Sequence, residues 1–167
     1  MDSVNVDKVN KLSKSDFISI FGNVFEKTTW IAEKVFVFKP FESFNELTER
    51  FLNIFENEKK ENHLKILNFH PELAVEKIMT IDSKKEQSNA GLDQCTKEEV
   101  EEFVKLNKDY KKKFNFPFII AVSGKNKSEI LDNFRKRIKN DKNTEFKEAI
   151  KQVKKIASLR LKQINNN

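Results

Sequence analysis

The sequence TEFKEAIKQVKKIASLRLKQI, residues 144–164, decides the fold class. Apolar residues recur along it at intervals of three, four or seven positions, which is the spacing that one face of an α-helix requires. They are Phe146, Ile150, Val153, Ala157 and Ile164. We therefore predict a last helix that begins near Thr144 and runs to about Ile164.

Further stretches have apolar residues at the same helical spacing. They run over residues 17–25, 30–35, 44–55, 64–69, 100–110 and 131–138. Two of these helices begin with a capping box, Ser43 with Glu46 and Thr96 with Glu99, which satisfies free backbone N–H groups at the helix start. We expect Ser128 to open the helix that continues to Ile138.

The run from Phe114 to Val122 has no clear helical period, which indicates an extended, buried segment that ends at Gly124. Only three glycines and three prolines occur in 167 residues, which disfavours a β-rich fold with many tight turns. The predicted fold class is therefore all-α: a single-domain bundle of seven to nine helices with one short extended segment. Residues 1–12 are polar and are expected to form a flexible segment before one helical domain over residues 13–167.

Charge and cysteine content narrow the classes of function. The formal net charge of +6 comes from 32 basic and 26 acidic residues spread among one another, which is typical of solvated helix faces. A basic protein would also suit an anionic small substrate. Cys95 is the single cysteine, so it forms no intramolecular disulfide, and we interpret it as structural. It has no Cys or His partners at zinc-ligand spacing, and we predict no metal site.

No stretch has the length of a signal-peptide core or of a membrane span, so we expect a soluble intracellular protein without a membrane partner. The C-terminal Asn165-Asn166-Asn167 is not a Ser-Lys-Leu address, which leaves the cytoplasm as the expected location and the peroxisome as the alternative. A glycine-rich phosphate loop, a Gly-x-Ser-x-Gly elbow and a His-Glu-x-x-His motif are all absent from the sequence. The aromatic residues are spaced for helix cores and not for stacking on bases, so no nucleic-acid partner is expected.

Arg160 falls on the apolar face of the last predicted helix, between Ala157 and Ile164. An arginine in the protein interior needs a partner, because burial of an unpaired charge is costly. Two interpretations stay open. The arginine pairs with a structural carboxylate, or it points into a pocket where its planar guanidinium binds a carboxylate or carbonyl oxygen.

His70 ends a predicted helix and directly precedes Pro71, which restricts the histidine backbone and so limits where the ring can point. The pKa range of histidine makes it the natural group for proton transfer, whereas a lone histidine is more often structural. Both interpretations of His70 stay open. The other histidine, His63, lies in a charged helix and is expected at the surface.

Ser83-Lys84-Lys85-Glu86 matches a capping box, so Ser83 and Glu86 have a structural explanation as the start of a helix. A helix start also offers free amides to an anion, so a cap and a binding site are compatible. Gln87 has no comparable structural explanation. A further polar group lies around a helix end and is interpreted as structural: Arg137, Asn140 and Glu145.

Motifs along nearly the whole chain resemble the OHCU decarboxylase family, whose substrate is 2-oxo-4-hydroxy-4-carboxy-5-ureidoimidazoline (OHCU). In chain order they are Phe21-Gly22-Asn23-Val24-Phe25-Glu26, Trp30-Ile31-Ala32, Lys39-Pro40-Phe41, His70-Pro71-Glu72-Leu73-Ala74, Ser83-x-x-Glu86-Gln87-x-x-Ala90-Gly91-Leu92, Leu106-Asn107-x-x-Tyr110, Phe114-x-Phe116-Pro117-Phe118, Arg137-x-x-Asn140 and Lys155-Ile156-Ala157-x-Leu159-Arg160-Leu161. Each motif is weak alone, and their order and spacing together are highly specific.

The resemblance implies an all-α homodimer that converts OHCU to (S)-allantoin in urate degradation without a cofactor. Residues 13–167 would form the OHCU decarboxylase-like domain. His70 and Glu86 fall on the family's catalytic histidine and glutamate. The substrate-binding positions of the family fall on Pro71, Ser83, Gln87, Arg160 and the backbone near Phe118 and Ile120.

The loop between Ala74 and Ser83 looks shorter than in many family members, which would reshape the rim of the pocket. The alternative function is a non-enzymatic helical interaction module that binds acidic partners through the basic surface. The position of four polar side chains distinguishes the enzyme from the interaction module. An enzyme needs all four to line one pocket: His70, Glu86, Gln87 and Arg160.

Overall fold

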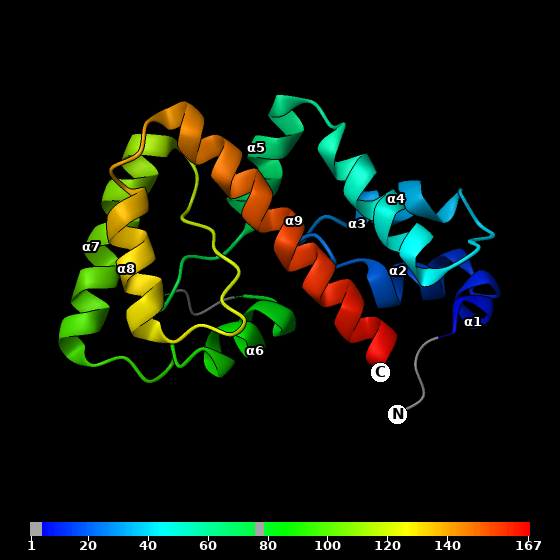
Figure 1. Ribbon diagram of the computed structural model, residues 1–167, viewed down its shortest axis with the longest axis horizontal. Helices are drawn as coiled ribbons and strands as arrows, with labels where there is room; N and C mark the ends of the chain where they lie inside the picture. Colours follow the sequence, from blue (N-terminus) through cyan, green and yellow to red (C-terminus); the bar gives the residue numbers. More distant parts are fainter. Residues whose placement is uncertain (1–4, 76–78) are drawn as a thin grey trace. The chain divides into compact units, whose positions relative to one another are not determined.

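Nine α-helices and no β-strand form the part of the chain that this computed structural model describes, residues 5–75 and 79–167. The helices are α1 (Val6–Asn10), α2 (Lys14–Phe21), α3 (Thr29–Phe36), α4 (Phe44–Glu56), α5 (Lys60–Phe69), α6 (Ile81–Asn89), α7 (Lys97–Phe114), α8 (Lys127–Arg137) and α9 (Lys142–Asn166) (Figure 1). The predicted all-α class with seven to nine helices is confirmed. None of the helices in the described ranges is long and apolar enough to cross a membrane.

The chain divides into two compact units. Unit 1 comprises Met1–Ile66 and Lys154–Asn167, and unit 2 comprises Leu67–Val153. The division falls inside α9, so this one helix contributes residues to both units. A single domain over residues 13–167 stays a prediction.

The first helix lies within the segment that was expected to be flexible. Val9 of α1 is fully buried, and the side chain of Asn10 exchanges two hydrogen bonds of 2.8 Å with the backbone of Phe41. The polar composition of the segment gave no sign of α1, because a single buried residue leaves no periodic stripe. The flexibility of residues 1–12 stays a prediction, and its first four residues lie outside the described ranges.

The core of unit 1 is built mainly from phenylalanines of α2 and α4. The rings of Phe17 and Phe21 lie 4.7 Å apart, and each contacts the ring of Phe51 in α4. Such ring pairs add to the free energy gained from burying apolar surface. Ser43 caps α4 as predicted, and its hydroxyl accepts from the backbone N–H of Glu46. The reciprocal bond differs from the predicted box, because the carboxylate of Glu46 accepts from the N–H of Glu42.

Helix α2 ends earlier than its sequence pattern suggests, because Gly22 forms its C-terminal cap. A Cβ at this position would lie 2.4 Å from the carbonyl oxygen of Ile18, so only glycine fits here without movement. Val24 and Phe25 follow the helix and are nonetheless buried. The apolar spacing therefore continues past the end of the helix, because these two residues are buried in the turn that follows it.

The core of unit 2 gathers aromatic rings from α7, α8 and the segment between them. Phe118 stacks on Phe134 of α8 at 3.9 Å, with an angle of 9° between the rings. Tyr110 of α7 meets both rings edge-on, at 5.5 and 5.7 Å. The segment of residues 115–126 contains neither helix nor strand, and Figure 1 shows its irregular course between α7 and α8.

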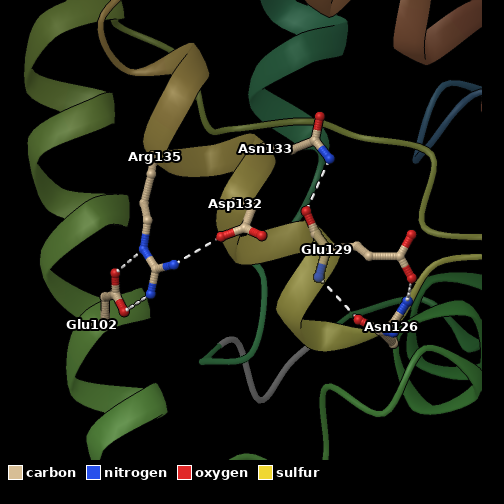
Figure 2. A network of polar contacts seen from close by, with 6 residues as sticks. All are labelled: Glu102, Asn126, Glu129, Asp132, Asn133 and Arg135. Carbon is tan, nitrogen blue, oxygen red and sulfur yellow. Dashed lines mark hydrogen bonds and ion pairs between the residues drawn. The ribbon is translucent and has the colours of Figure 1, made fainter.

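Helices α7 and α8 are also joined at their polar faces. Arg135 donates to both carboxylate oxygens of Glu102, at 2.7 and 2.5 Å, and to Asp132 at 2.9 Å (Figure 2). The capping box predicted for α7, Thr96 with Glu99, is confirmed.

The start of α8 lies before the residue that the sequence suggested. Its cap is Asn126, which forms a reciprocal capping box with Glu129 (Figure 2). The expectation that Ser128 opens this helix is therefore wrong by two positions. The physical reason is that the Asn126 side chain already satisfies the N–H of Glu129, and Ser128 lies inside the first turn.

Candidate functional site

His70 follows directly on α5 and its side chain is buried, with 8% of the residue exposed. Its backbone N–H donates to the carbonyl of Leu67 at 3.2 Å, which continues the last turn of α5 up to the histidine. Pro71 comes next and is half-buried. The prediction that a helix ends at His70 is confirmed, and His70 belongs to unit 2.

Helix α6 carries three of the predicted site residues: Ser83, Glu86 and Gln87. Its cap is Thr80, whose hydroxyl accepts from the N–H of Ser83 at 3.3 Å. The predicted capping box of Ser83 with Glu86 is therefore wrong, because both residues lie within the helix and Ser83 is its third residue. The structural explanation that the sequence offered for these two side chains no longer applies.

The C-terminal end of α6 is fixed by Gly91, whose φ is +80°. The N–H of Gly91 donates to the carbonyl of Ser88, and the N–H of Leu92 donates to the carbonyl of Gln87, both at 3.0 Å. This pair of bonds is the Schellman motif, which requires a left-handed residue that glycine adopts without steric cost. With a cap at both ends, α6 is a short rigid support for its side chains.

One face of α6 is turned to the protein interior. Ser83 and Gln87 are four residues apart and both buried, with 5% and 7% exposed, and Glu86 between them is half-buried. Residues at this spacing lie one above the other on a helix. The structure therefore brings the three predicted side chains to adjacent positions on one helix.

Gln87 connects α6 to the segment that follows His70 and Pro71. Its Oε1 accepts from the backbone N–H of Ala74 at 3.0 Å, and its Nε2 donates to the carbonyl of Glu72 at 3.4 Å. The statement that Gln87 has no structural explanation is therefore wrong. Its partners are backbone atoms 13 and 15 residues away, which no local pattern reveals.

The same segment has a second support that the sequence reasoning did not select. Asn107 of α7 is buried, and its Nδ2 donates to the carbonyl of Leu73 at 3.1 Å. Ala74 adopts a φ of +66°, a region that costs most residues about 1–2 kcal/mol. Asn107 lies on the same helical face as Phe103 and Tyr110, so a polar residue within an apolar stripe was the signal that could have identified it.

Phe118 and Ile120 lie in the buried segment between α7 and α8, with 1% and 5% exposed. Arg137 of α8 fixes this segment, because its Nη1 donates to the carbonyl of Ile119 at 2.6 Å and its guanidinium lies 4.4 Å from the Phe118 ring centroid. A second bond joins the N–H of Ala121 to Oε1 of Gln152 in α9, at 3.0 Å.

Arg137 belongs to a buried polar cluster around the carboxylate of Glu145, which is fully buried. Glu145 accepts from Arg137 Nε at 2.7 Å, from Asn140 Nδ2 at 3.1 Å and from the Tyr110 hydroxyl at 2.5 Å. Burial, together with the bond to the Glu145 carboxylate, raises the pKa of Tyr110 far above its ordinary value. The structural interpretation of this group is confirmed.

Arg160 lies in unit 1, on α9. It is buried, with 6% exposed, and it donates to Glu26 Oε2 at 2.9 Å and to the carbonyl of Asn23 at 2.8 Å. The interpretation in which Arg160 pairs with a carboxylate is therefore confirmed. The sequence reasoning did not select Glu26 as its partner, because Glu26 lies in a turn and not on a periodic helical face. The convergence of Arg160 with His70 stays a prediction.

His63 and Cys95 lie outside the set of proposed site residues. His63 is buried at 9% exposure, with its Nε2 2.6 Å from the carbonyl oxygen of Phe55, so the expectation of a surface position is wrong. The charged neighbours of His63 in α5 concealed a position that faces Phe55 of α4. Cys95 is half-buried, its Sγ lies 3.4 Å from the carbonyl of Leu92, and burial, with a smaller effect of Glu99, raises the pKa of its thiol.

Within residues 5–75 and 79–167, no group of three or more His, Cys, Asp or Glu side chains could hold a metal ion. Four of the proposed site residues belong to unit 2 and have polar side chains suited to proton transfer and hydrogen bonding: His70, Ser83, Glu86 and Gln87. Their convergence on one pocket stays a prediction.

The sequence model of the OHCU decarboxylase family matches residues 10–162. The chain belongs to this family. The match includes all the residues selected for the candidate site. It confirms the resemblance that the motifs indicated.

Members of the family in other organisms have clear sequence similarity to the chain. It is 34% identical to the 2-oxo-4-hydroxy-4-carboxy-5-ureidoimidazoline decarboxylase of Haloferax volcanii, over 96% of each chain. It is 39% identical to the uric acid degradation bifunctional protein of Bacillus sp. (strain TB-90), over 96% of this chain and 32% of that one. The chain thus spans about a third of the length of the bifunctional relatives that it matches.

Solved structures of the family have the same fold. The crystal structure of (S)-allantoin synthase matches with a TM-score of 0.78 and 26% identity, over 96% of this chain and 54% of that chain. A crystal structure of OHCU decarboxylase in the presence of (S)-allantoin matches with a TM-score of 0.73 and 24% identity, over 87% and 97%.

Proposed function

We propose that this chain is a decarboxylase that converts OHCU to (S)-allantoin in the degradation of urate. The observation that carries the proposal is the family match over residues 10–162. The local structure supports it, because the segment after His70 and the helix that carries Glu86 are bonded to one another through Gln87. A binding module would not require these two elements to be joined.

The chemistry assigns a role to each residue type. When CO2 leaves C4 of OHCU, the electrons of the broken C–C bond pass to the neighbouring C5=N bond of the ring, and the barrier falls if the developing negative charge is stabilised by preorganised donors. His70 contacts the substrate hydroxyl or carboxylate, assists the loss of CO2 and takes part in proton transfer. Glu86 orients His70 or holds the ureido and hydroxyl groups.

The remaining site residues bind and orient the substrate. Arg160 binds a substrate oxygen, and Pro71, Ser83 and Gln87 contact the substrate, Gln87 at the ring or ureido edge. The backbone near Phe118 and Ile120 contacts the imidazoline ring. The C4 hydroxyl then loses its proton and becomes the C4 carbonyl of allantoin, and addition of a proton to one face of C5, which bears the ureido group, gives the S configuration.

The proposal also includes the cofactor requirement, the oligomeric state and the location of the enzyme. The reaction needs no cofactor, because the C5=N bond of the substrate, next to the breaking bond, accepts the electrons. The active species is a homodimer, which light scattering would detect as a mass of about twice the 19.7 kDa of the chain. We place the enzyme in the cytoplasm, with the peroxisome as the alternative.

The test uses OHCU made freshly from urate by uricase and hydroxyisourate hydrolase, and circular dichroism to follow optically active allantoin. The protein should accelerate the appearance of the (S)-allantoin signal. A protein that leaves the rate unchanged is not this enzyme, and the helical interaction module would then be the better assignment.

The role of His70 is tested by the same substitution at both histidines of the chain. His70→Gln should lower kcat by about 100-fold or more, the usual contribution of a general acid or base. His63→Gln should keep kcat, because His63 is not one of the proposed site residues and its ring lies against Phe55 of α4. Far-ultraviolet circular dichroism checks that both variants are folded. Near-normal kcat in His70→Gln would remove the histidine from the mechanism.

A further inference from the structure

The segment between α7 and α8 is buried without belonging to a helix or a sheet. Residues 116–122 are all buried. Two side chains hold the backbone of residues 118–121: Arg137 at the carbonyl of Ile119 and Gln152 at the N–H of Ala121. In the part of the chain that the structure describes, no other hydrogen bond engages the backbone of these four residues. We call these two bonds the segment clamp.

The two clamped groups belong to alternate residues. In an extended backbone, the N–H and C=O of one residue point to the same side, and those of the next residue point to the opposite side. The carbonyl of Ile119 meets Arg137 of α8, and the N–H of Ala121 meets Gln152 of α9. On the extended path that the sequence predicts for this segment, the N–H and C=O of Phe118 and Ile120 face away from the clamp. Buried backbone groups require a partner, which a bound ligand can supply.

The orientation of the Gln152 amide follows from its partners. The N–H of Ala121 can only donate, so it must meet Oε1 of Gln152, at 3.0 Å. The Nε2 of Gln152 then donates to Oε1 of Glu148, one turn earlier on α9, at 2.8 Å. The side chain is fixed at both ends of its amide by partners that leave it one orientation.

We propose that Gln152 is a positioning residue for the decarboxylation. It acts with Arg137 to hold the backbone of residues 118–121, so that the polar groups of Phe118 and Ile120 face the substrate. The proposal rests on the proposed function, in which the backbone near these two residues contacts the imidazoline ring. Gln152 itself touches the segment and not the substrate.

Gln152 is the better of the two clamp residues for a test. Arg137 also pairs with the fully buried carboxylate of Glu145, so its replacement would leave a buried charge without its cation. Gln152 is only half-buried and neutral. Its replacement by methionine keeps the approximate length of the side chain and removes the acceptor for Ala121.

The experiment compares Gln152→Met with Gln163→Met, which makes the same change at an exposed position of the same helix. We expect Gln152→Met to raise KM for OHCU and to lower kcat/KM by about 10- to 100-fold, because small misplacements of positioning groups have effects of this size. A loss of folded protein would lower only the apparent kcat, so the rise in KM separates positioning from stability. Gln163→Met should match the wild type.

A rescue variant tests the hydrogen bond directly. Gln152→Glu combined with Glu148→Gln keeps an acceptor opposite the N–H of Ala121 and keeps a donor–acceptor pair along the helix. This double variant should recover most of the kcat/KM that Gln152→Met loses. Failure to recover it would assign the effect to lost packing and overturn the proposal.

Amide hydrogen exchange, measured by NMR, tests the clamp independently of activity. In Gln152→Met, the Ala121 amide should exchange at least about tenfold faster than in the control, because its hydrogen bond is gone. Faster exchange with kcat/KM within about twofold of the control would overturn the positioning role. A wild-type protein inactive on OHCU would overturn the proposed function itself, and the Ala121 exchange would then show separately whether the clamp exists.

Discussion

At the scale of single residues, the ion pair between Arg160 and Glu26 contributes to the stability of the fold in a way that the sequence does not reveal. Both side chains are almost fully buried, and their charged atoms lie 2.9 Å apart. Glu26→Gln removes the negative charge and leaves the guanidinium buried. We expect the free energy of unfolding in urea to fall by about 3–5 kcal/mol, the usual cost of removing one partner of a buried pair.

Glu102→Gln is the matched control for this change. Glu102 pairs with Arg135 at the surface, where the two side chains are 35% and 48% exposed. An exposed pair contributes about 0–1 kcal/mol, so this variant should remain close to the wild type in urea. Equal losses in the two variants would contradict the assignment of Glu26 as a buried partner.

At the scale of single residues, the periodicity of apolar residues indicated burial for Arg160 on a helix and gave no information for residues in turns. Arg160 was identified as a buried cation because it interrupts the apolar face of α9. Its partner Glu26 lies in a turn, where no repeat distinguishes a buried carboxylate from an exposed one. Gln87 was misjudged for a related reason, because its bonds reach backbone atoms of another segment. Side-chain partners distant in sequence have no local signature.

The start of α8 provides a prediction for a single element. Asn126→Ala removes the cap that accepts from the N–H of Glu129 at 2.9 Å. We expect a loss of about 1 kcal/mol in the free energy of unfolding, the usual value for a cap replaced by alanine. Chemical denaturation followed by circular dichroism would measure it.

Ser128→Ala is the control, because Ser128 is the residue that the sequence favoured as the cap. It is exposed in the first turn of α8, so its replacement should change the free energy of unfolding by less than about 0.5 kcal/mol. A larger loss in Ser128→Ala than in Asn126→Ala would place the helix start at Ser128 after all.

The helix starts show where local sequence identifies the capping residue and where it leaves two candidates. The caps at Ser43 and Thr96 were predicted correctly. At α6 and α8, the capping residue stands directly before the helix, and a Ser follows in the first turn: Thr80 and Ser83, Asn126 and Ser128. Both members of each pair have the chemistry of a cap. Only the path of the preceding chain selects one, and this path depends on tertiary contacts.

At the scale of the whole molecule, α9 is the element on which both units depend. It supplies Glu145 and Gln152 to unit 2 and Arg160 to unit 1. Lys154→Pro would remove a hydrogen bond in the middle of this helix and introduce a steric clash with the preceding turn. The expected cost is about 3 kcal/mol or more. Amide exchange should become faster in both units.

Lys154→Ala serves as the control, because it also removes the exposed pair of Lys154 with Glu56, whose atoms lie 3.2 Å apart. Its free energy of unfolding should change by about 1 kcal/mol or less. Faster exchange confined to unit 1 in Lys154→Pro would show that unit 2 does not depend on the intact helix.

The fold class was predictable because scarce glycine and proline and long apolar stripes are properties of the whole sequence. The division into two compact units was not, because it depends on which helix faces meet. The candidate site was predictable only through the combined order of the motifs. His70, Ser83, Glu86 and Arg160 each had an ordinary structural explanation from the sequence. The structure confirms the one for Arg160 and supplies one for Gln87, which had none.

Cys95 gives the protein a natural position for chemical labelling. It is the single cysteine of the chain and lies in the turn between α6 and α7, bonded to the carbonyl of Leu92. Its raised pKa keeps the thiol mostly protonated near neutral pH, and thiols react as thiolates, so a maleimide or disulfide reagent reacts slowly with the folded protein. Leu92 completes the Schellman motif of α6, so the thiol is bonded to a residue that closes this helix. We expect the modification rate to rise when the helix loosens, which would report, without mutation, on the helix that carries Ser83, Glu86 and Gln87.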